Sequence, residues 1–155
     1  MRGLWANAAL WIPISAAVAV QLFKFIWESA RKGVWDFQVL GRSGGMPSSH
    51  TAMMSSLATV LGYDYGLDSP VFAISAVMAI IVMYDARGVR QESGKQARVL
   101  NQIVREFFRG QPIGEKELKE LLGHTGTEVL VGALVGVAYS LTCLLWVVPL
   151  LTQRA

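Results

Sequence analysis

The sequence has few charged residues and a single cysteine. Charged residues make up 16% of its 155 positions, whereas a soluble domain carries about a quarter. This shortage, together with 53% hydrophobic residues and a mean hydropathy of +0.41, indicates a membrane protein. The one cysteine, Cys143, lies in an apolar run. The sequence therefore excludes a disulfide framework and a cysteine metal cluster.

The apolar residues gather into four runs that predict hydrophobic helices: Leu4–Phe23, Ser48–Gly62, Val71–Tyr84 and Thr127–Leu151. A bilayer core needs about 20 helical residues, so the first and last runs are long enough to span it. The run that starts at Ser48 is short for a span, and we expect it to begin buried in protein. In the last run, Gly132 and Gly136 are one turn apart, a spacing that allows close helix contact in lipid.

A polar stretch at about 91–123 separates the third and fourth runs. Its first part has the spacing of an amphipathic helix, with apolar residues at Val99, Leu100, Ile103, Val104 and Phe107. Gly110 and Pro112 should end that helix. The stretch could be a lid, a partner surface or a helix lying on the membrane. We therefore predict an all-α, polytopic membrane helix bundle in one domain over residues 1–155, with a polar helical insertion.

Basic residues predict the orientation of the chain. If every apolar helix crosses the membrane, residues 24–50 and 85–125 share one side. That side then holds all of the 14 lysines and arginines except Arg2 and Arg154. The positive-inside rule predicts a multi-pass cell-membrane protein with this side in the cytoplasm and both termini outside. The alternative is that these basic groups mainly serve an anionic ligand, which would weaken the orientation argument.

Residues 44–51, Gly-Gly-Met-Pro-Ser-Ser-His-Thr, predict a tight turn followed by a helix. Pro47 starts a helix well, because its missing N–H would be without a partner there anyway. Ser48 and Ser49 offer hydroxyl and N–H groups at the positive end of the helix dipole, where a phosphate-like anion binds readily. His50 on the first turn could then act on the bound anion. The alternative is an ordinary turn with a surface histidine.

The chain has only one other histidine, His124, at the mouth of the last apolar run. Glu128 follows it by four residues, which is one helical turn. A carboxylate there could accept the proton of one ring nitrogen and leave the other free to attack an electrophile. The alternative is a simple surface pair. That reading is weakened because both histidines fall on the same predicted side of the membrane.

Several cations could hold a phosphate. Lys24 and Arg31 are seven residues apart and so share a helix face. Asp85 and Arg90 lie at the end of the third apolar run. A phosphate needs several fixed cations as charge develops on its oxygens during transfer. The alternatives are that Lys24 extends to the membrane interface and that Asp85 and Arg90 pair with each other.

A divalent metal could in principle bind to the two histidines with Glu128 and Asp85. The lysines and arginines nearby would repel a metal ion, whereas they suit a phosphate. We therefore expect no metal at this site.

These pieces resemble the type-2 phosphatidic acid phosphatase superfamily, which is related to the vanadium haloperoxidases. Its first motif is a lysine, six residues and Arg-Pro, and Lys24 to Arg31 has this spacing with Lys32 in place of proline. Its second motif is Pro-Ser-Gly-His, which residues 47–50 match with serine for glycine.

The third motif of the superfamily is Ser-Arg, five residues, a histidine, three residues and an aspartate. His124 and Glu128 have the final spacing, with glutamate for aspartate. No Ser-Arg stands just ahead of His124, and Arg90 is the closest substitute, far upstream. With these departures the chain resembles the divergent branch of the superfamily. Members of that branch share four segments: Gly-Gly-Met-Pro-Ser-Ser-His, Tyr/Phe-Asp-Ala-x-Gly-Val-Arg, a Gly-Lys-Gln-Ala-like run and a late Leu-Gly-His. The chain carries them at 44–50, 84–90, 94–97 and 122–124.

The resemblance implies a phosphatase that needs no metal and no cofactor. His124 would attack phosphorus to form a phosphohistidine, Glu128 would orient His124, and His50 would protonate the leaving oxygen and then activate water. The phosphate oxygens would be held by Lys24, Arg31, Arg90 and the N–H groups near Ser48 and Ser49, with Asp85 as a supporting residue.

The substrate implied is a lipid phosphate of the phosphatidate, phosphatidylglycerol phosphate or polyprenyl (di)phosphate class. Membrane lipids are the other expected partners, we expect no nucleic acid, and homo-oligomerisation stays open. A rival interpretation is a non-catalytic membrane protein that binds anionic lipid or phosphate, since the departures from the motifs leave room for lost activity. A second rival, a transporter or scaffold, would need charged residues deep within several spans.

Overall fold

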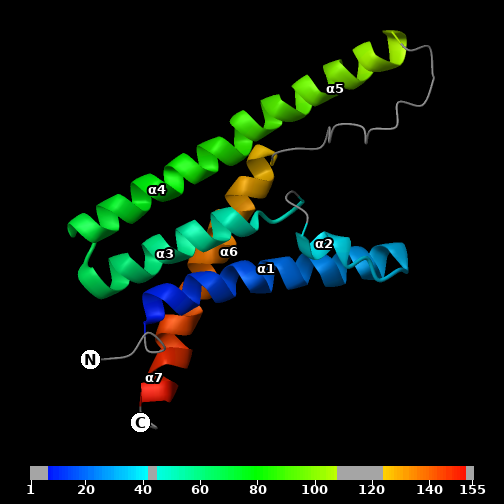
Figure 1. The fold of residues 1–155 in the computed structure, drawn as a ribbon. Coiled ribbons are helices and arrows are strands. Elements are labelled where there is room, and N and C mark those ends of the chain that lie inside the picture. Colours follow the sequence, from blue (N-terminus) through cyan, green and yellow to red (C-terminus); the bar gives the residue numbers. More distant parts are fainter. Residues whose placement is uncertain (1–6, 42–44, 108–123, 153–155) are drawn as a thin grey trace.

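The computed structural model describes residues 7–41, 45–107 and 124–152, and these residues form helices without any strand. In chain order the elements are α1 (Ala8–Lys32), α2 (Gln38–Gly41), α3 (Ser49–Tyr65), α4 (Pro70–Arg87), α5 (Val89–Phe107), α6 (Gly126–Thr142), a π-helical turn (Cys143–Val147) and α7 (Val148–Thr152). Figure 1 shows α3 between α1 and α4, with α5 continuing the line of α4 beyond the bundle. The predicted all-α helix bundle is confirmed.

Three helical segments are long and apolar enough to cross a membrane: Ala8–Lys32, Pro70–Ile103 and Gly126–Leu150. The predicted run at Ser48 also forms a helix, α3, but it has only 17 residues. It contacts α1, α4 and α6. Because α3 has neighbours on several sides, it can carry polar residues that would be costly against lipid, and Thr51, Ser55 and Ser56 are buried there.

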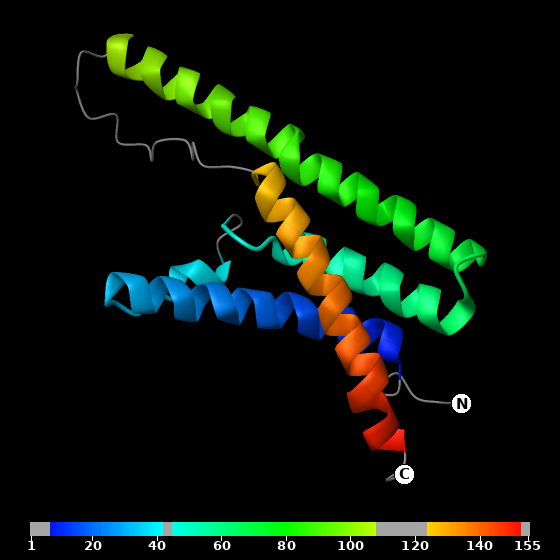
Figure 2. The same ribbon diagram turned by 180° about the vertical axis from the view of Figure 1, so that it is seen from behind.

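Helix α6 crosses α1 and α3 steeply, behind them in Figure 1 and in front of them in Figure 2. Small residues make this crossing close, as the spacing of Gly132 and Gly136 predicted. A Cβ atom on Gly132 would lie 2.7 Å from the carbonyl oxygen of Ser48. About two turns further along α6, the hydroxyl oxygens of Ser140 and Ser56 are 2.6 Å apart. The start of α3 is therefore held directly against the first half of α6.

Replacing Gly136 with alanine is expected to destabilise the bundle by about 1–3 kcal/mol. A Cβ atom there would overlap the Ala52 carbonyl oxygen and the Ser55 hydroxyl, and backbone atoms cannot rotate away. The melting temperature of the purified protein in detergent measures the effect. The matched control is Gly41→Ala, where a Cβ atom meets nothing within 4 Å. Equal melting temperatures for the two variants would contradict the close α3–α6 contact.

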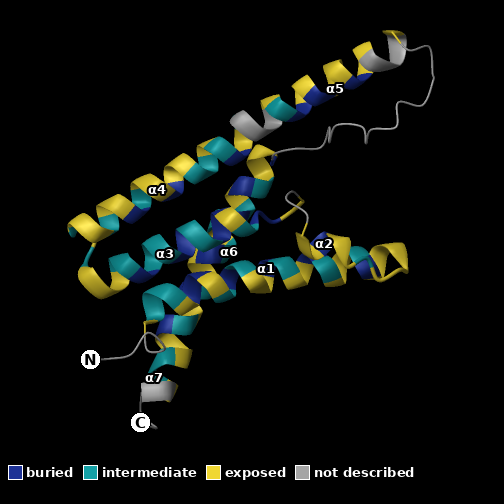
Figure 3. Cartoon of the chain, in the orientation of Figure 1, coloured by how far each residue is buried: buried dark blue, intermediate teal, exposed yellow. Residues whose placement is uncertain are grey.

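The outer face of α4 exposes a broad apolar surface, which Figure 3 shows as exposed along most of that helix. It includes Val71, Ile74, Val77, Met78, Ile80, Ile81 and Tyr84. Such a surface would be a liability in water, whereas lipid covers it at no cost. The exposed face therefore agrees with α4 as a membrane-spanning helix.

Two helix boundaries differ from those expected. Helix α1 continues past Phe23 to Lys32, because Glu28 and Lys32 form an i,i+4 ion pair of 2.8 Å. Gly33, at φ 69°, then ends α1 by donating its N–H to the Ser29 carbonyl. A one-turn helix, α2, also forms inside the predicted loop 33–47. The expected amphipathic helix is present as α5, whereas its predicted end near Gly110 lies outside the described residues.

Candidate active site

The N-terminus of α6 fixes Glu128 in a capping box. The side chain of Thr125, the N-cap residue, accepts the Glu128 N–H at 3.3 Å. The Oε2 atom of Glu128 accepts the Thr125 N–H in return at 3.1 Å. This reciprocal pair satisfies two N–H groups of the first turn and places a negative charge at the positive end of the helix dipole.

The same Oε2 atom of Glu128 lies 3.1 Å from Nδ1 of His124. The predicted contact between the two residues is therefore present, although His124 precedes the N-cap instead of lying on the helix. An ionised carboxylate can only accept a hydrogen bond, so Nδ1 carries a proton, and in the neutral imidazole Nε2 then keeps its lone pair. The His124 side chain is only 5% exposed.

A second hydrogen bond ties His124 to α4. Its backbone N–H donates to the carbonyl oxygen of Ala86 at 2.9 Å. Ala86, in the last turn of α4, is itself buried. The backbone of His124 is thus bonded to α4 while its ring is bonded to α6, so the imidazole is held from two directions.

The residue before α3 links the Pro-Ser-Ser-His segment to the same place. Ser48 donates its N–H to the carbonyl oxygen of Glu128 at 3.2 Å. The hydroxyl oxygen of Ser48 accepts the N–H of Thr51 at 3.4 Å, which caps α3. Because the Ser48 N–H is used inside the protein, the expectation that it binds phosphate needs correction. Ser49 and His50 supply the next N–H groups of the first turn of α3.

Lys24 is buried beneath the same loop, where its side chain is 4% exposed. The Cδ atom of Lys24 lies 3.8 Å from the Cβ position of Gly45, whose φ of 81° suits glycine. Its charge interacts with Glu128 and with Glu28. Helix α1 continues past Lys24 to Lys32, and the buried position of Lys24 argues against the alternative that its side chain extends to the membrane interface. Three helices thus bring Lys24, Ser48 and the His124–Glu128 pair together.

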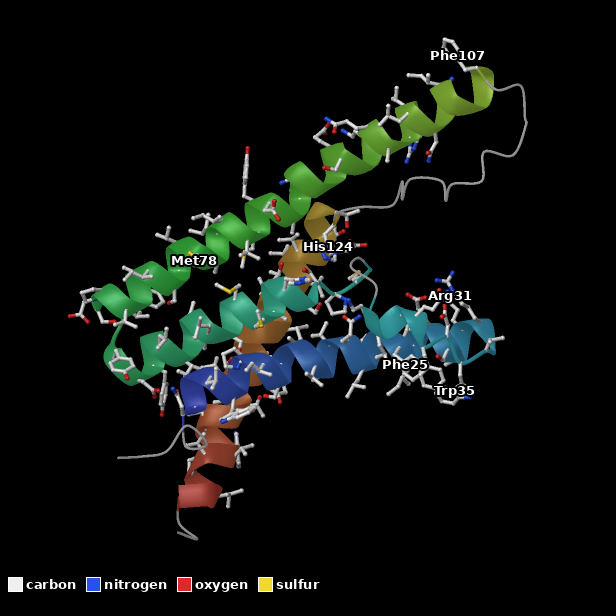
Figure 4. The ribbon with its side chains drawn as sticks, in the orientation of Figure 1. Phe25, Arg31, Trp35, Met78, Phe107 and His124 are labelled. Carbon is white, nitrogen blue, oxygen red and sulfur yellow. The ribbon has the colours of Figure 1, made fainter. Side chains whose placement is uncertain are left out.

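The other predicted residues lie around this cluster or away from it. Arg31 is exposed near the C-terminal end of α1, and Figure 4 shows it well to the side of His124. Seven residues advance a helix by about 10.5 Å, which is why a shared face does not bring Arg31 to the position of Lys24. His50 is exposed on the first turn of α3, and Asp85 is half-buried beside Ala86. Arg90 belongs to the first turn of α5, and its side chain is outside the described part.

Arg87 is a cation of this site that the sequence motifs did not identify. Its Nε atom lies 3.5 Å from the Cβ position of Gly126, the first residue of α6. The guanidinium is therefore beside the loop that carries His124. The only sequence signal was the Asp-Ala-Arg-Gly-Val-Arg segment itself, which offers two arginines and does not say which one faces His124.

The donor set suits an oxyanion better than a metal ion. Within the described residues, no three His, Cys, Asp or Glu side chains are grouped so that they could hold a metal. The buried ammonium of Lys24 interacts with Glu128, and the exposed guanidinium of Arg87 lies beside Gly126, two residues after His124. Cations near a buried imidazole can hold and polarise a phosphate group.

Comparison with known proteins agrees with a membrane protein of this kind. The chain is 37% identical over 149 residues to the uncharacterized membrane protein YuiD of Bacillus subtilis (strain 168), in a match covering 89% of this chain and 94% of that protein. No solved structure matches it significantly. A family model described as "Divergent PAP2 family" matches residues 5–139, a range that includes His124, Glu128 and Lys24. The chain therefore belongs to the Divergent PAP2 family, a divergent branch of the type-2 phosphatidic acid phosphatase superfamily.

Proposed function

We propose that the protein is an integral membrane phosphatase that hydrolyses a lipid phosphomonoester or diphosphate through a phosphohistidine on His124. The observation that carries the proposal is the 3.1 Å contact between Nδ1 of His124 and Glu128. It orients a buried imidazole whose Nε2 lone pair is available for attack. Membership of the family supports the same chemistry.

In the first step, Nε2 of His124 forms a bond to phosphorus and the bond from phosphorus to the lipid oxygen breaks. The leaving oxygen takes a proton from His50. Glu128 keeps hold of the Nδ1 proton and stabilises the positive charge on the ring. In the second step His50 takes a proton from water, the water oxygen bonds to phosphorus, and the P–N bond breaks. His124 is then restored, and phosphate leaves. The exposure of His50 suits a residue that exchanges protons with solvent.

Lys24 and Arg87 are the cations that we assign to the phosphate oxygens. They come from α1 and α4, so the phosphate would sit between these helices and the starts of α3 and α6. The N–H groups of Ser49 and His50 at the start of α3 would complete the site. Arg90 and Asp85 remain predicted contributors, whereas we leave Arg31 out because of its distant position. The basic residues support a cytoplasmic site with both termini outside. This orientation requires that α3, which is not among the three segments long enough to span, also carries the chain across the membrane.

The test is phosphate release from a panel of lipid phosphates by the purified protein, with and without a chelator. The expected result is release that a chelator does not reduce, together with acid-labile, base-stable labelling of the protein by a ³²P-labelled substrate. Release that requires a divalent metal would contradict the mechanism. Folded protein that binds anionic lipid but releases no phosphate from any member would favour the non-catalytic binding protein instead.

A further inference from the structure

A large apolar cavity lies between α1 and α6, next to the candidate active site. Its volume is about 580 Å³, within the range of roughly 300–1,000 Å³ usual for small-ligand sites. Ala16 and Val20 contribute to one wall, Val131 and Val135 to the other, and Met46 with Pro47 borders a third side. The cavity is partly open, since Phe23 and Trp27, which also line it, are exposed. Tyr139 also borders it, but its hydroxyl already donates to Ser15 at 3.0 Å. The cavity thus offers a ligand mainly hydrocarbon contacts.

Each helical wall carries a charged residue next to its apolar lining, although on α1 the lining itself continues to Phe23 and Trp27. On α1, Ala16, Val20 and Lys24 are spaced by four residues, so they lie along one face. On α6, Val135 and Val131 line the cavity, and Glu128 follows on the same face toward the N-terminus. Lys24 and Glu128 are themselves close enough for their charges to interact. The two charged residues beside the walls therefore lie together at the candidate active site.

The third border of the cavity joins it to the site through the backbone. Met46 and Pro47 line the cavity, and the next residue, Ser48, bonds to the Glu128 carbonyl oxygen. The cavity therefore borders the segment that leads into the candidate site, and a ligand in it can direct a polar end toward Lys24 and Glu128. Such a ligand needs an apolar body and an anionic end.

We propose that this cavity binds the hydrocarbon chain of the lipid phosphate substrate and thereby selects for it. The proposal rests on the function proposed above and adds where the chain lies. The walls belong to α1 and α6, both long and apolar enough to span the membrane. A lipid can therefore enter from the bilayer without its chain crossing water. Binding energy from the chain would hold the phosphate between Lys24 and His124.

The test is a pair of tryptophan variants on α6. Val135→Trp places an indole in the cavity, whereas Leu134→Trp places it on the outer face, where Leu134 is 61% exposed. Both proteins are assayed in nanodiscs against a long-chain lipid phosphate and a water-soluble short-chain analogue with the same head group. Val135→Trp is expected to raise KM for the long-chain substrate at least about tenfold. We expect it to leave kcat, and the kinetics of the short-chain substrate, within about twofold.

Leu134→Trp is expected to leave KM and kcat unchanged for both substrates. The proposed binding of the hydrocarbon chain in the cavity would be overturned if the two tryptophan variants had equal effects. It would also be overturned if Val135→Trp lowered kcat/KM equally for both substrates.

A second measurement does not depend on catalysis. A long-chain lipid phosphate with a diazirine near the chain end should label α1 and α6 at the cavity in the wild type and not in Val135→Trp. Unlabelled lipid phosphate should compete for this labelling, whereas the corresponding lipid alcohol should not. Equal competition by the alcohol would mean that ordinary bilayer lipid fills the cavity, and would overturn the proposal. Specific labelling without phosphate release would contradict only the phosphatase function. Phosphate release without specific labelling would contradict only the binding of the hydrocarbon chain in the cavity.

Discussion

Replacing His124 with glutamine is expected to lower kcat for lipid phosphate hydrolysis by about 10⁴-fold or more, the order seen when a nucleophile is removed from a catalytic unit. Glutamine is polar and similar in size, so its amide can still donate to Oε2 of Glu128. It cannot form the P–N bond, however. The backbone hydrogen bond from residue 124 to Ala86 does not involve the side chain and should persist. Phosphate release under saturating substrate measures the effect.

Glu128→Gln is the informative companion of this variant. Glutamine can serve in a capping box as glutamate does, so the start of α6 should keep its structure and the melting temperature should change little. Its amide no longer supplies the negative charge that stabilises a positive His124 ring. We expect kcat to fall by about 10²-fold, less than for His124→Gln. If both variants kept wild-type rates, the His124–Glu128 pair would have no part in catalysis.

The helices of the bundle could be predicted from sequence because each has its own local signal. Apolar runs of the right length predicted α1, α4 and α6, and the spacing of Val99, Ile103 and Phe107 predicted the amphipathic α5. The glycines at 132 and 136 indicated that α6 allows a close helix contact, whereas the partner, α3, is known only from the structure. The end of α1 could not be predicted from its apolar run. It depends on the Glu28–Lys32 pair and on the left-handed conformation of Gly33, and neither is an apolar feature.

The site itself was only partly predictable, because it joins residues far apart in the chain. Spacing alone indicated the contact of His124 with Glu128, which lie four residues apart. The arrival of Arg87 beside Gly126 depends on how α4 meets α6, and no periodicity encodes that meeting. The motifs missed Arg87, whereas they included Arg31. The spacing of Arg31 from Lys24 matches the motif, but Arg31 is exposed and lies away from His124.

Replacing Lys24 with methionine is expected to lower kcat/KM for lipid phosphate by about 10²–10³-fold, the usual loss when one fixed electrostatic group of a transition state is removed. Methionine is unbranched and nearly as long, so it can keep the packing of the lysine stem against Gly45. It removes the buried positive charge that interacts with Glu128 and Glu28. The change spares the desolvation of the ammonium, and the loss of its charge is tempered because Glu128 is partly exposed to water. We therefore expect the protein to remain folded.

Lys32→Met is the matched control for this change, on the same helix. Lys32 is exposed and pairs with Glu28 at 2.8 Å, and surface pairs of this kind contribute only about 0–1 kcal/mol. Its kcat/KM should stay within about twofold of wild type. Inorganic phosphate, used as a competitive inhibitor, separates binding from folding: its inhibition constant should rise at least about tenfold in Lys24→Met and not in Lys32→Met. An unchanged inhibition constant in Lys24→Met would show that the buried ammonium supports Glu128 without touching the phosphate.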